Sequence, residues 1–100
     1  MTQIIIVYWR DIPAQVIAKQ GRRSAKRVLS ARFEKAIDRA AMASGARDAD
    51  AYLAGWRRGE PAPCGDDLES EAAAAGERLE TAYGEERLAA LVRAGGREPG

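Results

Sequence analysis

Four positive charges fall within six residues of the segment 20–27, which reads QGRRSAKR. Ser24 predicts a helix start, where cations are disfavoured because the helix dipole already places positive charge at that end. Free backbone N–H groups, the serine hydroxyl and the cations would together bind phosphate or carboxylate. The alternative is a solvated basic face, paired with the acidic second half of the chain. The candidate anion-binding residues are Arg22, Arg23, Ser24, Lys26 and Arg27.

The chain contains no histidine, which removes the usual general base and the usual metal ligand. Acid–base chemistry would then fall to Asp11, Lys19, Tyr52 or Cys64, none of which lies near another in the sequence. Because this spacing assembles no catalytic group, we predict no catalytic residues and no cofactor.

Cys64 precedes a predicted helix, whose N-terminus would lower the thiol pKa. The neighbouring Asp66 and Asp67 act in the opposite direction, so a small residue in a tight loop is the favoured interpretation of the cysteine. These two acids, with Glu69 and Glu71, lack the spacing of a calcium-binding loop, and acids are common at helix starts. Glycine-rich nucleotide loops are absent. We therefore predict no metal site.

Length and composition indicate one domain over residues 1–94 and a disordered tail over 95–100. The net charge is +1, but residues 1–50 hold ten basic and five acidic side chains, and residues 51–100 hold six and ten. A nearly neutral domain makes nucleic-acid binding the less favoured use of the basic half. The apolar runs are too short to span a bilayer, no signal peptide is recognisable, and one cysteine cannot form an internal disulfide. These features predict a cytoplasmic protein with no membrane partner.

The hydrophobic pattern predicts an α+β fold with the element order β-β-α-β-α-α. Strands are expected at 3–9, 14–20 and 52–58, and helices at 24–44, 66–83 and 85–92. The first strand is apolar on both faces, so it should be central, giving a three-stranded antiparallel or mixed sheet of order 2-1-3. The helices should cover one face of this sheet.

A sheet covered on one face only would expose apolar residues of its central strand on the other. Exposed apolar patches of this kind mark partner surfaces. We assign Trp9, Tyr52 and Trp56 to this surface, because large aromatic residues are enriched at interfaces.

Several segments resemble the small bacterial domain family called "virulence factor". They are IPAQV at 12–16, RRS at 22–24, RFEKAID at 32–38, AYL at 51–53 and Trp56. The resemblance covers roughly residues 3–83 and extends to the domain in conserved virulence factor C-type proteins. It implies a bacterial, cytoplasmic protein with an accessory or interaction role, and it transfers no catalytic residue. It also suggests an association with one-carbon metabolism.

The favoured function is therefore a non-enzymatic interaction module. Its open sheet face would bind a protein partner or a second copy, and Arg22–Arg27 would engage an anionic group such as a phosphate-bearing ligand. One alternative is an enzyme or enzyme subunit acting on a phosphorylated or carboxylated small molecule, in one-carbon metabolism. A second alternative is nucleic-acid binding.

Overall fold

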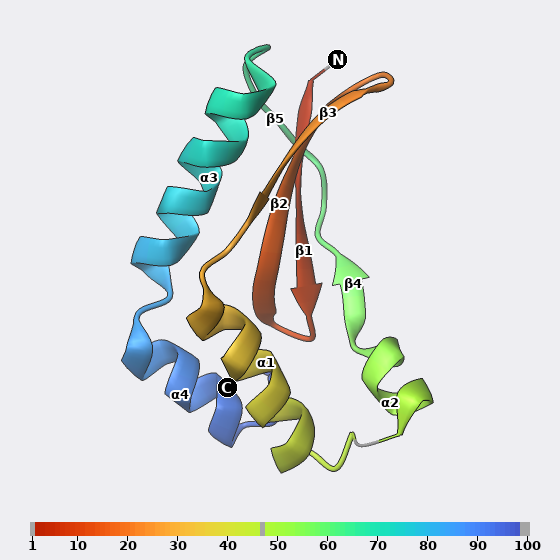
Figure 1. Cartoon of the computed structure of the whole chain (residues 1–100), viewed down its shortest axis with the longest axis vertical. Coiled ribbons are helices and arrows are strands. Elements are labelled where there is room, and N and C mark those ends of the chain that lie inside the picture. The colour runs from red at the N-terminus through yellow and green to blue at the C-terminus, as the bar shows by residue number, and fades with distance from the viewer. Residues whose placement is uncertain (1, 47, 99–100) are drawn as a thin grey trace.

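The computed structural model describes residues 2–46 and 48–98 and shows a sheet flanked by helices (Figure 1). Three strands of the sheet precede the first helix in the chain. The elements follow in the order β1 (Gln3–Trp9), β2 (Ile12–Gln20), β3 (Arg23–Val28), α1 (Ala31–Ala43), α2 (Ala49–Ala54), β4 (Trp56–Arg58), β5 (Ala62–Pro63), α3 (Leu68–Ala82) and α4 (Glu85–Arg93). The α+β class is confirmed.

The sheet has five strands rather than three. Its order is β3-β2-β1-β4, with β5 also pairing β1, and every pairing is antiparallel. The predicted order 2-1-3 is present within this five-stranded sheet as β2-β1-β4. The predicted central position of the first strand is correct, because β1 pairs on both of its edges.

The helix predicted from Ser24 is wrong over its first turns. Gly21 adopts φ +60° in a two-residue turn, and the chain then pairs with β2 from Gln20↔Arg23 to Gln15↔Val28. Helix α1 begins only at Ala31, after Ser30 as N-cap. Six residue pairs along β2 supply the backbone partners that a helical turn would otherwise give, and this tertiary pairing overrides the local N-cap signal.

Tyr52 also lies outside its predicted strand. It belongs to the short helix α2, where the N-cap Asp48 accepts a hydrogen bond of 2.8 Å from the backbone N–H of Ala51. Only Trp56–Arg58 of the predicted strand 52–58 pairs with β1. The two later helices are confirmed: Asp67 caps α3, and α4 follows directly after Gly84.

Two clusters of buried side chains hold the elements together. In one, α3 lies along one face of the sheet and packs on Ile4, Val16 and Ala18. In the other, α1 and α4 gather with Trp9 and Ile12 at the end of the sheet where β1 turns into β2 (Figure 1).

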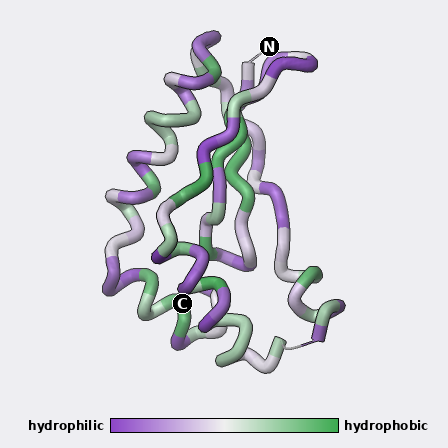
Figure 2. Tube along the Cα trace, in the orientation of Figure 1, coloured by the Kyte–Doolittle hydropathy of each residue, from purple (hydrophilic) through white to green (hydrophobic). Residues whose placement is uncertain are grey.

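The opposite face of the strands contributes to neither cluster over much of its length. Paired residues of antiparallel strands share a face, and neighbours along a strand alternate. Since Ile4, Val16 and Ala18 face α3, the residues Ile5, Val7 and Ile17 point the other way. None of these three belongs to a cluster, but Ile5 is buried, whereas Val7 and Ile17 are half-buried. Figure 2 shows the hydrophobic stretch along β1 and β2 and the hydrophilic β2–β3 turn beyond it. We call this side of the sheet the open face.

The segment 95–98 packs against the β1–β2 turn, although the sequence predicts a disordered tail over 95–100. Asp11 donates a backbone hydrogen bond of 2.7 Å to the Gly96 carbonyl, and Arg10 Nη1 donates one of 2.7 Å to the Gly95 carbonyl. Arg87 also pairs with Glu98 at 2.9 Å. These contacts tie the end of α4 to the sheet. Residues 99–100 lie outside the described residues.

Glu80 joins the end of α3 to the start of α1. Its carboxylate accepts hydrogen bonds from the Ser30 backbone N–H at 2.7 Å and the Ser30 hydroxyl at 2.8 Å, and it pairs with Arg32 at 3.0 Å. Burial alone would raise the pKa of Glu80, but the hydrogen bonds from Ser30 and Arg32 outweigh it and hold the pKa below its ordinary value.

Replacing Glu80 with glutamine should therefore weaken the fold in a pH-dependent way. A folded-state pKa below the unfolded value, which is about 4.3, adds stability above that value and loses it as the pH falls through the folded pKa. We expect Glu80→Gln to cost about 1–3 kcal/mol at neutral pH and less in acid, because the Ser30 and Arg32 donors lose a charged acceptor. Urea unfolding at pH 7 and in acid measures both values. An equal cost at both pH values would contradict this role, and the exposed Glu86→Gln on α4 is the control.

Candidate functional site

The basic cluster lies on an edge strand and its turn, not at a helix start. Arg22 sits in the β2–β3 turn, and the alternation of β3 divides the others between two sides. Arg23 and Arg27 share a side with Ala25, which packs toward α3, whereas Ser24 and Lys26 lie on the open face. Strand alternation therefore separates Ser24 and Lys26 from Arg23 and Arg27, and Ser24 does not begin a helix.

Edge position gives the positive charges of β3 a physical role. An unpaired strand edge can template pairing with another chain, and charged side chains oppose this. The cations on the α3 side also face acids. The Arg27 guanidinium lies 3.9 Å from the Glu77 carboxylate. Arg23 lines a shallow polar hollow together with Asp66, Asp67 and Glu69. This geometry favours the solvated-face alternative. Anion binding by the cluster stays a prediction.

Trp9 belongs to the core rather than to a surface. Its side chain is 0% exposed, and its indole N–H donates a hydrogen bond of 2.8 Å to the Tyr52 carbonyl. Tyr52 is half-buried and Trp56 is 36% exposed, so only these two of the predicted partner-surface residues reach solvent. Trp9 is buried because α1, α2 and α4 close over the end of β1.

The four acid–base candidates remain apart in the fold. Asp11 lies in the β1–β2 turn and pairs with Arg57 at 3.1 Å, while Lys19 is exposed near the far end of β2. Tyr52 belongs to α2, and Cys64 packs beside the α3 cluster. No constellation of these groups supports the enzyme alternative.

Cys64 and the acids that follow it lack the features of a reactive site. Burial, followed by the charges of Glu71 and Asp66, raises the pKa of the Cys64 thiol, which disfavours the reactive thiolate. Asp67 instead caps α3 by accepting from the Ser70 N–H at 3.1 Å. Among residues 2–46 and 48–98, no group of three or more acids and cysteines is placed to hold a metal ion.

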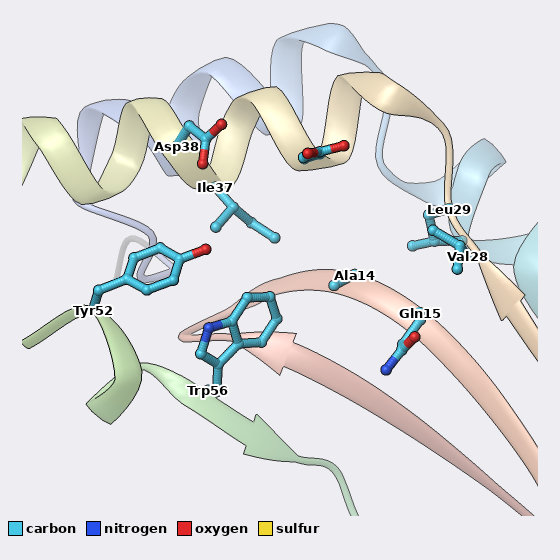
Figure 3. A pocket seen from close by; sticks show the side chains of 9 residues that line it. Ala14, Gln15, Val28, Leu29, Ile37, Asp38, Tyr52 and Trp56 are labelled. Carbon is cyan, nitrogen blue, oxygen red and sulfur yellow. The ribbon is translucent and has the colours of Figure 1, made fainter. Parts of the chain in front are cut away.

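A pocket of about 300 Å³ opens where α1 and α2 meet the end of the open face (Figure 3). Its floor is apolar and is formed by side chains of β2, β3 and α1. Its rim carries Tyr52, Trp56 and two carboxylates of α1. The lining residues are Ala14, Gln15, Val28, Leu29, Glu34, Ile37, Asp38, Tyr52 and Trp56.

Two aromatic side chains form one wall of this pocket. Tyr52 and Trp56 meet edge to face, with ring centroids 6.0 Å apart and an interplanar angle of 81°. The Tyr52 hydroxyl points into the pocket beneath Ile37 (Figure 3). Burial, then the charge of Asp38, raises the pKa of Tyr52, although the neighbouring Trp56 side chain lowers it. The phenol is therefore neutral at physiological pH and is available as a hydrogen-bond donor.

Glu34 and Asp38 form the opposite, acidic wall. They stand four residues apart on α1, and like charges at this spacing cost a helix about 0.2–0.5 kcal/mol. Within the described residues neither has a cation within 4.0 Å. Sequence reasoning missed both acids as site residues. The repeated acid at i, i+4 beside the apolar stripe of α1 was the available signal.

The family comparison identifies what the chain is similar to. A family model described as "Virulence factor" matches residues 7–92. No curated protein and no solved structure matches the chain. In the described part of the chain, no helix is both long enough and apolar enough to cross a membrane.

Proposed function

The chain belongs to the Virulence factor family, and we propose that it is a non-enzymatic binding module of the bacterial cytoplasm. Its open face docks a protein whose surface presents apolar side chains flanked by carboxylates. The observation that carries this proposal is the apolar, cation-flanked part of the open face, including Val7, Ile17 and Val28, that belongs to neither buried cluster.

The apolar part of the open face runs across four strands. Val28 is 65% exposed and Trp56 is 36% exposed, on either side of the half-buried Ile17 and Val7. Aromatic and aliphatic side chains grouped in this way supply the desolvated centre of a binding surface. On a monomer they would stay in contact with water at a cost in free energy.

Positive charges flank this apolar strip. By strand alternation Lys19 and Lys26 lie on the open face near the β2–β3 turn, and Arg58 lies on it opposite Val7. No acidic residue occupies an open-face position of β1, β2, β3 or β4. Charge complementarity therefore favours an acidic partner, whose carboxylates would also supply the anionic groups expected of the basic cluster.

Site-specific photocrosslinking in the native host tests this assignment. A photoreactive residue replacing Val28 should form one defined adduct, whose mapped peptide contains apolar residues beside acids. The same replacement at Met42, which is 61% exposed on α1, is the matched control and should not form that adduct. Lys26→Glu combined with Arg58→Glu should reduce the Val28 adduct by about tenfold or more, because the charges would then repel the partner.

Three results would overturn the proposal. The first is an equal adduct pattern from positions 28 and 42, which would mean that the open face has no preference for a partner. The second is an adduct between two copies of this chain, which would make the open face a self-association surface. The third is an adduct that persists unchanged in the double glutamate variant, which would show that the partner is not recognised through its acidic groups.

A further inference from the structure

We propose that the pocket between α1, α2 and the end of the open face binds an organic cation, namely a guanidinium or ammonium head group. The pocket combines an aromatic wall, an acidic wall and an apolar floor (Figure 3). Val28 and Trp56 line both this pocket and the open face. The inference nevertheless differs from the docking proposal, because it depends on Glu34 and Asp38 of α1, which the docking proposal does not use.

The aromatic wall supplies the first component of cation recognition. A cation is attracted to the negative face of an aromatic ring, most strongly to tryptophan. Tyr52 and Trp56 meet at 81°, so a group held between them contacts the face of one ring and the edge of the other. Trp9 stacks behind Tyr52 with centroids 5.9 Å apart and supports this wall from the core.

The acidic wall supplies the charge. Glu34 and Asp38 face the same pocket from successive turns of α1, and a guanidinium can donate to two carboxylates through its several N–H groups. The same charges repel phosphate and carboxylate. This pocket is thus unsuited to the anionic ligands predicted for the chain, and its chemistry is opposite to that of the β2–β3 turn.

The apolar floor and the volume limit what else can enter. Leu29, Ile37 and Ala14 would contact the methylene groups that carry the cationic head. A volume of about 300 Å³ is at the lower end for ligand pockets, which span roughly 300–1,000 Å³. It suits one arginine-like or lysine-like side chain, and it is small for a nucleotide.

Titration of the purified chain with small cations tests the site by NMR, observed at the indole N–H of Trp56. N-acetyl-arginine methylamide represents an arginine side chain of a protein, and butylguanidinium represents a free small cation. N-acetyl-citrulline methylamide is the uncharged control of nearly the same shape. We expect both cations to give saturable shifts, with the ratio of their affinities indicating which source fits better, and the citrulline compound to give none.

Variants separate the pocket from general surface charge. Glu34→Gln combined with Asp38→Asn should weaken binding of the arginine probe by about tenfold or more, the effect of losing a charge-assisted contact. Glu69→Gln combined with Glu86→Gln removes two acids from the first turns of α3 and α4 and should leave binding unchanged. Lys26→Glu with Arg58→Glu should also retain probe binding, so failure of the open-face proposal and failure of this one are distinguishable.

Three results would overturn the inference. The first is the absence of a saturable Trp56 shift with either cation. The second is equal binding of the citrulline compound, which would remove the role of charge. The third is unchanged binding of the arginine probe in the Glu34→Gln and Asp38→Asn double variant, with circular dichroism showing that the variant is folded.

Discussion

Replacing Trp9 with alanine should lower the free energy of unfolding by about 3–5 kcal/mol, as for other fully buried aromatic side chains. The ring is 0% exposed, stacks on Tyr52 and lies 4.7 Å from the Arg10 guanidinium. The change would also leave the Tyr52 carbonyl without its 2.8 Å hydrogen bond from the indole. Total stabilities of small domains are about 5–15 kcal/mol, so a large fraction of the stability should be lost. Urea unfolding followed by circular dichroism measures it.

Trp56→Ala is the matched control for this prediction. Trp56 pairs with Trp9 across β1 and β4, yet it is 36% exposed. Its loss should cost about 0.5–1.5 kcal/mol, because part of its surface is already in water. A larger cost for Trp56 than for Trp9 would mean that Trp9 does not occupy the core as described.

Replacing Gly96 with alanine should cost about 2–5 kcal/mol, from backbone strain and overpacking together. Gly96 adopts φ +92°, and an added Cβ would lie 2.8 Å from Cζ3 of the Trp9 ring. The ring has no room to move, since it is fully buried, and the Gly96 carbonyl accepts a hydrogen bond of 2.7 Å from Asp11. Thermal and urea unfolding of the variant measure the cost.

Gly45→Ala separates the two contributions to the Gly96 effect. Gly45 also has a positive φ of +79°, but an added Cβ would meet nothing within 4 Å. Its replacement should therefore cost only the backbone strain, about 1–2 kcal/mol. The excess at Gly96 measures the contact with Trp9. Equal costs at the two glycines would show that the segment 95–98 does not pack on the ring.

Local signals in the sequence were sufficient for the C-terminal helices and the central strand. Asp67 followed by an apolar stripe at helical spacing determined α3, because both the cap and the stripe are properties of neighbouring residues. The run from Ile4 to Trp9 is apolar on both alternating faces, and a strand of that composition needs partners on both edges and cover on its faces. The fold class and the order β2-β1-β4 followed from these two features.

Tertiary pairing decided the segment 23–28 against the local signal. Ser24 and the helix-forming residues after it are compatible with a first helical turn, but Arg23–Val28 pairs with β2 and the cap falls at Ser30. Ala25 lies between the polar residues Ser24 and Lys26, which fits a strand with one side toward α3, a preference that exists only once β2 and α3 are in place. The anion-site hypothesis required a helix that begins at Ser24, and the pairing of this segment with β2 rules that helix start out.

The candidate pocket depended on the tertiary structure throughout. Glu34 and Asp38 come from α1, Tyr52 from α2 and Trp56 from β4, and the α1 acids are separated along the chain from the aromatic residues. Sequence spacing places the two acids on one side of a helix, but it does not say which segment that side will meet. The packing of α1 and α2 over the end of β1 determines which segment the acids meet, because it buries Trp9 and leaves Trp56 at the edge. Side-chain types were readable from the sequence, whereas their shared cavity arises from packing between distant segments.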